Sequence, residues 1–208
     1  MSDYLTDEEQ VDRLKKLWKD YGITVVVALA VGIGGTVAWD YFKAYQSDKA
    51  QDASNLYTSY LEASGLGEPT SSFVEELESN YGQSAYFAFT LLRQAKGEVD
   101  EANFEAAHES LTRAFEVARG SPIGDLVALR KAKVEFELGD YESVLLTLQE
   151  VQTAGYRWQA LMLKGDVHFQ NNELDAARDA YQSAKDQLPV GFESGVVEMR
   201  LASVPPAP

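Results

Sequence analysis

The sequence predicts an all-α protein in which a single N-terminal membrane-spanning helix is followed by a solenoid of helical hairpins. Three observations support this fold. Nineteen residues between Asp20 and Asp40 include no ionisable side chain other than Tyr21. The chain beyond them repeats a helical pattern of small and large apolar residues, and no segment shows the alternation typical of a strand.

Composition limits the classes of partner and chemistry. The 208 residues are 45% hydrophobic, enough for a packed core, and carry a formal net charge of −15. A surface this acidic repels phosphate backbones, so we expect no nucleic-acid partner. Cysteine is absent, and His108 and His168 lie sixty residues apart. The sequence therefore contains neither a thiolate zinc site nor a local histidine pair, and no metal or cofactor is expected.

Residues 1 to 20 are predicted to form a short amphipathic arm. Thr6 and Glu9 have the spacing of a capping box. The apolar residues that follow recur on one helical face, as Val11, Leu14, Leu17 and Trp18. Because six acidic residues interleave with four basic ones in the arm, its attraction to anionic membrane lipid should be weak.

Residues 21 to 42 are predicted to be a transmembrane helix. The uncharged stretch is about 28 Å long as a helix, at ~1.5 Å per residue. That length is close to the ~30 Å hydrocarbon core of a bilayer. Aromatic side chains favour the headgroup level, and they flank the stretch as Trp18, Tyr21, Trp39, Tyr41, Phe42 and Tyr45.

Two other interpretations of this stretch fit less well. A signal peptide cleaved after Ala30 would leave only Ile23 to Val27 as its apolar region, which is shorter than the roughly seven residues needed. A buried core helix would show polar residues at the helical period, whereas only Thr24 and Thr36 interrupt the apolar character. A single membrane anchor is the prediction we adopt.

The distribution of basic residues predicts the orientation of the anchor. Four basic residues lie in the first twenty positions, and two, Lys43 and Lys49, lie in the twenty after Trp39. By the positive-inside rule the amino terminus is cytoplasmic. The chain from residue 43 onward then lies across the membrane, which in a bacterium is the periplasm.

Small residues recur along the anchor at helical spacing. One stripe consists of Ala30, Gly34 and Ala38, and a second consists of Ala28, Gly32 and Thr36. A stripe of this kind lets a second membrane helix approach closely, so we treat these residues as a candidate membrane-helix packing face. The alternative, that glycine is simply common in membrane helices, remains open at this stage.

Beyond the anchor the sequence predicts helices with local start and stop signals. Residues 43 to 64 lack proline and glycine and read as one helix, followed by the loop "GLGEPT". Ser72 and Glu75 have the spacing of a capping box for the next helix. Further along, Ser121 and Pro122 are placed as an N-cap and a first-turn proline.

The clearest repeat is "WQALMLKGDVHFQNNELDAARDAYQSAKDQLP", residues 158 to 189. Its Gly165, Ala177, Tyr181, Ala184 and Pro189 fall at positions typical of a tetratricopeptide repeat. A small residue on the first helix lets it cross the second closely, and a large residue on the second fills the remaining space. Residues 43 to 203 are therefore predicted to be a tetratricopeptide repeat-like domain, and 204 to 208 a flexible tail.

Two earlier segments match the same pattern less closely. Thirty-three residues upstream, Ala132, Val144 and Leu148 occupy the positions of Gly165, Ala177 and Tyr181. A third unit is degenerate and has a longer turn, and its matching residues are Phe104, Ala107, Leu111 and Ala114.

Taken in order, these segments resemble the YfgM-like family of ancillary subunits of the bacterial Sec translocon. The resemblance rests on "DEEQVDRLKKLWKDYG", "AWDYF", "QSDKAQDASNLY" and "VVEMRLASV". It implies a single-pass inner-membrane protein whose periplasmic domain associates with the Sec translocon and with a membrane-anchored periplasmic chaperone of the peptidyl-prolyl isomerase type. It also implies a role in passing exported polypeptides to periplasmic chaperones.

The candidate partner surface is the concave face lined by the first helices of the hairpins. The repeat register places six residues there: Leu126, Leu129, Lys133, Gln159, Met162 and Asp166. Met162 is an adaptable apolar contact, although leucine and methionine at helical spacing also suit a plain core. The lysine and asparagine clamp that holds a terminal carboxylate in some repeat proteins is disfavoured, because Met162 and Asp166 occupy key positions.

No pattern of catalytic residues supports an enzyme. The sequence has no nucleophile elbow and no phosphate-binding glycine loop, and a hydrolase with a dispersed active site is a remote alternative. The stronger alternative is a membrane-tethered scaffold of another envelope complex, because the same repeats serve many assemblies.

Overall fold

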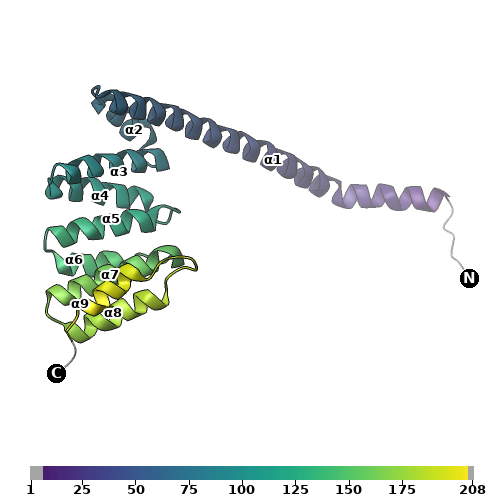
Figure 1. Ribbon diagram of the computed structural model, residues 1–208. Helices are drawn as coiled ribbons and strands as arrows, with labels where there is room; N and C mark the ends of the chain where they lie inside the picture. Colours follow the sequence, from purple (N-terminus) through teal and green to yellow (C-terminus); the bar gives the residue numbers. More distant parts are fainter. Residues whose placement is uncertain (1–6, 206–208) are drawn as a thin grey trace, which may run out of the picture. The chain divides into compact units, whose positions relative to one another are not determined.

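The computed structural model describes residues 7 to 205, and Figure 1 shows a chain built from helices and turns. Within the described residues there are nine helices and no strand. They are α1 (Asp7–Leu66), α2 (Ser71–Tyr81), α3 (Ala85–Asp100), α4 (Phe104–Ala118), α5 (Gly124–Glu137), α6 (Tyr141–Leu148), α7 (Ala154–Gln170), α8 (Leu174–Asp186) and α9 (Gly195–Ser203). The predicted all-α fold is confirmed.

The chain divides into two compact units whose boundary lies inside α1. The first unit ends at Asp52 and the second begins at Ala53. The sequence predicted an arm, an anchor and a further helix ending at residue 64, yet α1 runs through all three as one helix to Leu66. The predicted capping residue Thr6 lies outside the described residues.

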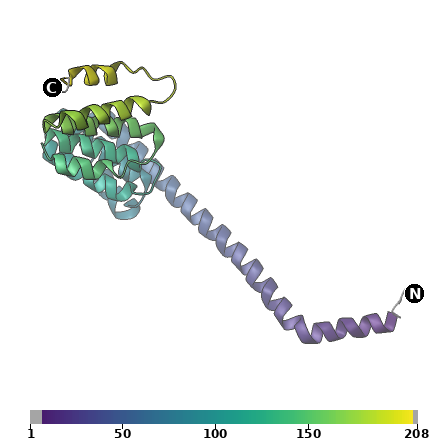
Figure 2. The same ribbon diagram turned by 90° about the horizontal axis from the view of Figure 1, so that it is seen from below.

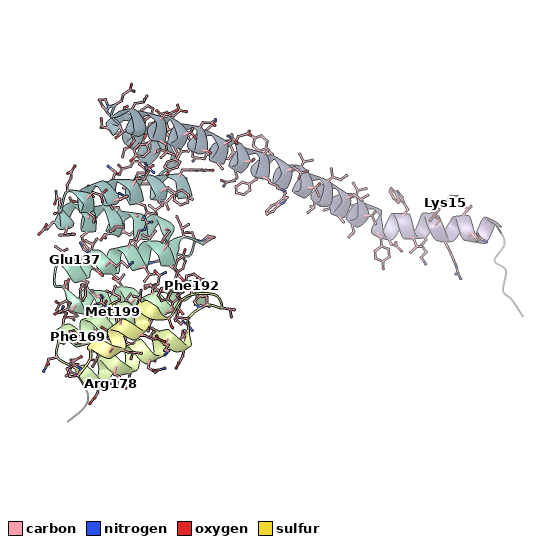
Figure 3. All side chains as sticks on the ribbon, in the orientation of Figure 1. Lys15, Glu137, Phe169, Arg178, Phe192 and Met199 are labelled. Carbon is pink, nitrogen blue, oxygen red and sulfur yellow. The ribbon has the colours of Figure 1, made fainter. Side chains whose placement is uncertain are left out.

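From residue 10 to the end of the first unit, the side chains of α1 are exposed on every face of the helix (Figure 3). Gly22 is an exception, because the indole of Trp18 covers it and lies 3.2 Å from where a Cβ would sit. Large apolar residues such as Leu29 and Ile33 are 59% and 64% exposed. Such a surface requires lipid or other helices around it.

In the second unit three hairpins stack in chain order, α3 with α4, α5 with α6, and α7 with α8 (Figure 1). The end of α1 covers the first hairpin, where Tyr57 packs against Tyr86 and Phe89 with ring centroids about 6 Å apart. At the other end α9 forms an outer layer beside α8 (Figure 2). The hairpins are therefore capped at both ends of the stack.

Each hairpin uses the same pairing of a small residue on its first helix with a large one on its second. The pairs are Ala95 with Leu111, Ala132 with Leu148, and Gly165 with Tyr181, and the large residues are 8% exposed or less. In the third pair, a Cβ on Gly165 would lie 2.3 Å from the Tyr181 ring. The structure thus confirms the repeat register predicted from the sequence.

The turn inside each hairpin also repeats. Ala102, Gly139 and Asn172 have φ of 58°, 76° and 59°, in the left-handed region. In each case the next backbone N–H donates to a carbonyl five residues earlier, as when Asp140 N–H donates to the Glu135 carbonyl at 3.0 Å. This hydrogen bond closes the first helix, and the residue that donates it becomes the N-cap of the second.

Three local predictions were wrong. Helix α2 begins at Ser71 with Thr70 as N-cap, so the Ser72 and Glu75 capping box does not form. Helix α5 begins at Gly124 after a turn that contains Ser121 and Pro122. Val204 is buried and the Pro205 carbonyl accepts a hydrogen bond from Arg178, so the packed domain extends past the predicted end at residue 203.

Replacing Gly165 by alanine should destabilise the repeat domain, because the new methyl group would overlap the Tyr181 ring. We expect the free energy of unfolding to fall by about 1 to 3 kcal/mol, even though alanine favours a helix by ~1 kcal/mol over glycine. Urea unfolding of the full-length chain in detergent, followed by pulse proteolysis, measures this change.

Gly155→Ala is the matched control, because a Cβ on this glycine of the same helix would meet no atom within 4 Å. That variant should unfold at the same urea concentration as the unmodified chain or a slightly higher one. Equal stability of Gly165→Ala and the unmodified chain would mean that the close crossing of α7 and α8 does not depend on Gly165.

The Asp125 carboxylate of α5 caps the start of α7, because the backbone N–H groups of Gln152 and Thr153 both donate to it. Partial burial tends to raise the pKa of Asp125, but hydrogen bonds from Thr153 and Gln152 outweigh it and hold the pKa below its usual value. A carboxyl whose pKa is lowered on folding stabilises the fold above its unfolded pKa of ~3.9, and loses that effect as the pH falls through the folded value.

Asp125→Asn should therefore reduce the free energy of unfolding at neutral pH by about 1 kcal/mol, since the contact is partly exposed to solvent. The difference from the unmodified chain should shrink as the pH falls from 5 to 3. Urea unfolding across this range measures it, and a difference that does not depend on pH would contradict the cap.

Candidate functional site

The six residues predicted to line the concave face lie on α5 and α7, as expected, but they differ in exposure. Leu129 and Met162 are only 2% and 8% exposed and belong to the buried clusters between helices. These two are core residues and are not accessible to a partner. Leu126 and Gln159 are half-buried, and Lys133 is exposed.

Asp166, the sixth predicted residue, stabilises the end of the stack. Its carboxylate accepts a hydrogen bond from the Tyr181 hydroxyl at 2.7 Å and pairs with Arg200 of α9 at 3.2 Å. Burial, followed by the bond to Asp166, raises the pKa of Tyr181, which keeps its hydroxyl protonated as a donor. Asp166 therefore joins the last hairpin to its capping helix.

Helix α9 covers the last hairpin with one side and leaves the other open. Val197 is fully buried in the cluster that includes Tyr181. Met199 and, in the preceding loop, Phe192 are 66% and 60% exposed and are labelled at this end of the domain in Figure 3. The Phe192 ring lies 5.9 Å from that of Trp158.

A cavity of about 300 Å³ lies between α3, α4 and α5. Its lining is Leu92, Ala95, Lys96, Val99, Leu111, Arg130, Lys133 and Val134. The floor is apolar, since Leu92, Leu111 and Val134 are each 5% exposed or less. Lys133 was predicted from the repeat register to face a partner, whereas Lys96 and Arg130 were not.

A second cavity, of about 480 Å³, lies between α6 and α7. Its lining is Leu145, Leu148, Gln149, Val151, Gln152, Arg157, Ala160, Leu161, Lys164 and His168. Helix α6 has eight residues and the corresponding α4 has fifteen. The turn after the short helix therefore forms one wall, where α4 in the first hairpin continues as helix.

Both cavities differ in charge from the rest of the domain. All but four of the 18 basic residues and all but six of the 33 acidic ones lie from Asp40 onward, which gives that part of the chain a net charge of −13. Yet among the described residues each cavity is lined by basic side chains and by no acidic one. The spacing of Arg130 and Lys133, one helical turn apart, is a sequence signal that could have indicated the first cavity.

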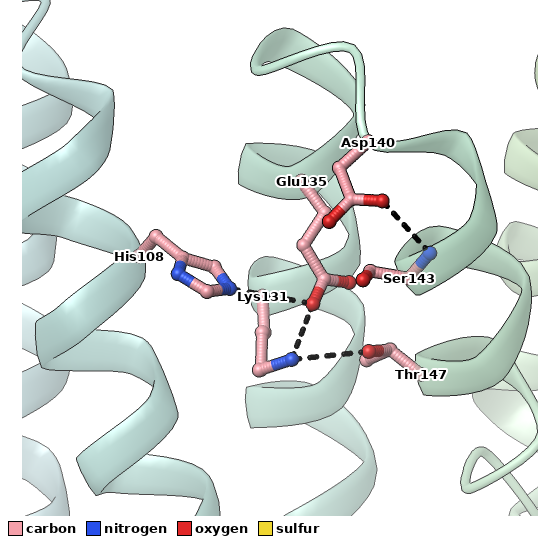
Figure 4. Close-up of polar contacts among 6 residues, drawn as sticks. All are labelled: His108, Lys131, Glu135, Asp140, Ser143 and Thr147. Atoms are coloured by element: carbon pink, nitrogen blue, oxygen red, sulfur yellow. Dashed lines mark hydrogen bonds and ion pairs between the residues drawn. The ribbon is translucent and has the colours of Figure 1, made fainter.

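A cluster of buried polar groups joins the first two hairpins (Figure 4). Glu135 of α5 is 1% exposed and pairs with Lys131 on the same helix. Its Oε1 also lies 3.4 Å from His108 Nε2 of α4, and Lys131 donates to the Thr147 hydroxyl of α6 at 3.2 Å. Because Glu135 Oε2 has no hydrogen-bond partner, the carboxylate depends on the Lys131 ammonium for charge compensation. The cluster fixes α5 between its neighbours.

The part of the chain that the structure describes contains one helix long and apolar enough to cross a membrane. It is α1, with a mean hydropathy of 2.0 over its most apolar window, and it carries the predicted stripe. Ala30, Gly34 and Ala38 are all exposed. A Cβ on Gly34 would meet no atom within 4 Å, as at Gly32 and Gly35 on other faces of the helix, so it is the small size of the side chains that suits the stripe to close helix packing.

Comparison with known proteins agrees with these features. A family model described as a tetratricopeptide repeat-like domain matches residues 15–205. An ancillary SecYEG translocon subunit of Haemophilus influenzae is 27% identical over 198 residues, which are 95% of this chain and 97% of the relative. A protein of the same name from Aggregatibacter actinomycetemcomitans is 24% identical over 202 residues, which are 95% of this chain and 97% of the relative. Another, from Escherichia coli K12, is 25% identical over 185 residues, which are 88% of this chain and 89% of the relative. No solved structure matches the chain. The resemblance noted from the sequence is thus confirmed.

The buried pair of Lys131 and Glu135 leads to a test of the cluster. Lys131→Met would leave the Glu135 carboxylate buried without its closest cation, and should lower the free energy of unfolding by about 3 to 5 kcal/mol. Replacing both residues, as Lys131→Met with Glu135→Met, removes the buried charge and should restore most of that loss.

Urea unfolding of the two variants and of the single Glu135→Met variant completes a double-mutant cycle. Losses that simply add in the double variant would contradict the proposed dependence of Glu135 on Lys131.

Proposed function

The chain belongs to the tetratricopeptide repeat-like domain family, and from this premise we propose that it is a non-enzymatic adaptor of the Sec translocon in the bacterial inner membrane. The relatives named as ancillary SecYEG translocon subunits match it over 88% or more of its length. The similarity therefore takes in both the apolar part of α1 and the hairpins. This full-length match is the observation that carries the proposal.

In this proposal α1 crosses the membrane once with its amino terminus in the cytoplasm. The basic residues Arg13, Lys15, Lys16 and Lys19 precede the apolar segment, which favours that orientation. The arm is then residues 1–20, the membrane-spanning part 21–42, and the hairpins lie in the periplasm. The exposed apolar faces of α1 contact membrane lipid, and the small-residue stripe packs against helices of the translocon.

The hairpin domain would bind a membrane-anchored periplasmic chaperone of the peptidyl-prolyl isomerase type and help to pass exported polypeptides to it. Stacked hairpins offer extended surfaces for such partners. The net charge of −13 from Asp40 onward keeps the domain away from anionic lipid and attracts basic surfaces of partner proteins.

A photoreactive residue at Gly34 tests the contact with the translocon. Because Gly34 lies in the middle of the small-residue stripe, we expect it to crosslink to membrane helices of the translocon in intact cells. The same residue at Leu29, about 140° around α1 from Gly34 at 3.6 residues per turn, should crosslink mainly to lipid.

Mass spectrometry of the crosslinked products identifies the neighbours. Crosslinks from Gly34 to subunits of a cell-division or outer-membrane assembly machine would favour the alternative scaffold. Crosslinks from both positions to lipid alone would contradict a packed stripe.

A further inference from the structure

We propose that the cavity between α3, α4 and α5 binds segments of exported polypeptides in which a bulky apolar side chain is flanked by aspartate or glutamate. This inference rests on the proposed function, because it requires the domain to meet exported chains. It adds the chemical class of segment that the domain selects, and it assigns the selection to one cavity.

The shape of the cavity fits an apolar side chain. Its volume of about 300 Å³ is at the lower end of the range for ligand pockets. Leu92 of α3, Leu111 of α4 and Val134 of α5 form an apolar floor. Since α3 and α5 both pack on α4, an apolar group that enters between them contacts three helices at once. Its burial from water supplies the affinity.

The charges around the cavity fit carboxylates. Lys96, Arg130 and Lys133 line it, and no acidic residue among those described does so. Lys96 is paired with Asp100 on its own helix. Neither Arg130 nor Lys133 has a carboxylate partner within the described part of the chain, so both remain available to a ligand. In a domain with a large excess of acidic residues, such a group of cations is a local exception.

The character of these cations favours varied segments over one fixed sequence. Lysine and arginine carry their charges on long flexible stems that can lie along apolar surface while the charged group reaches outward. They can therefore meet carboxylates at several distances from the buried side chain. A cavity that binds one apolar side chain and attracts negative charge near it can accept exported polypeptides of differing sequence.

Binding of labelled peptides to the full-length chain in lipid nanodiscs tests the inference by fluorescence anisotropy. The probe is a peptide with a central Leu-Phe pair flanked by acidic residues. Two control peptides replace the flanks by lysine or the central pair by alanine. The acidic probe should bind at least about tenfold more tightly than either control, which corresponds to ~1.4 kcal/mol.

The variant Arg130→Glu with Lys133→Glu reverses both unpaired charges and should weaken binding of the acidic probe by about tenfold or more. The matched control, Arg157→Glu with Lys164→Glu, makes the same change at the cavity between α6 and α7 and should leave binding unchanged. Urea unfolding of both variants shows whether they remain folded. If instead the α5 variant is folded and binds normally, or the lysine-flanked peptide binds as tightly as the probe, the inference is wrong.

The Gly34 photocrosslink, recorded in the Arg130→Glu, Lys133→Glu background, separates this inference from the proposed function. Crosslinks to the translocon together with unchanged peptide binding would overturn the inference and leave the adaptor role intact. Absence of those crosslinks in the unmodified chain would overturn the adaptor role itself.

Discussion

The fold of the hairpin domain depends on one steric constraint, the pairing of a small residue on the first helix of each hairpin with a large residue on the second. The two helices can approach closely only where the first lacks side-chain bulk, and the large residue then fills the space that remains. The third hairpin takes this furthest, with Gly165 against Tyr181. Because tyrosine also carries a hydroxyl, that contact does more than pack: it holds Asp166, which in turn holds Arg200 of the capping helix. A packing rule inside one hairpin thus extends to the end of the stack.

The same repetition explains where the domain is hollow. The first two hairpins contact one another mainly through α4 and α5, whereas α7 of the third hairpin contacts α5 and α6 equally. The helices α3 and α5 are therefore separated from each other where both pack on α4, and the first cavity lies between them. Variation between hairpins adds the second cavity, because α6 ends after eight residues and a turn follows it. Arg130 and Lys133 form no ion pair within the described part of the chain, so their charged groups beside the apolar floor are not engaged by the fold.

Sequence reasoning succeeded where the physical signal is local. Gly165, Ala177 and Tyr181 are close in the chain, and their spacing alone indicates a tight hairpin. It failed where two roles share one pattern: Leu129 and Met162 have the spacing of both a core and a binding face, and only the position of the neighbouring helices shows that they are buried. Two of the three basic residues around the first cavity, Lys96 and Arg130, were missed for a related reason. Lys96 and Arg130 lie on different hairpins, so nothing in their spacing indicates that the fold brings them together. The Ser72 and Glu75 capping box failed because the N-cap of α2 is Thr70, two positions earlier, and the helix begins at Ser71.

Because α1 is one continuous helix, the domain that contains the small cavity is joined directly to the apolar segment. One helix supplies the apolar segment in the first unit and, through Ala53, Tyr60 and Ala63, part of the packed core in the second. The proposed contact, in which a cavity of about 300 Å³ buries a single side chain, holds a free peptide only weakly, since ordering that peptide costs free energy. Attachment of the protein to the proposed export site changes this balance. A short tether raises the effective concentration of the cavity near the exported polypeptide to the order of millimolar. Weak binding is then sufficient while a polypeptide is being exported, and the bound segment of that polypeptide is released readily once it moves away from the site. The proposed role of passing exported polypeptides onward requires this combination, which a deep and tight pocket would not provide.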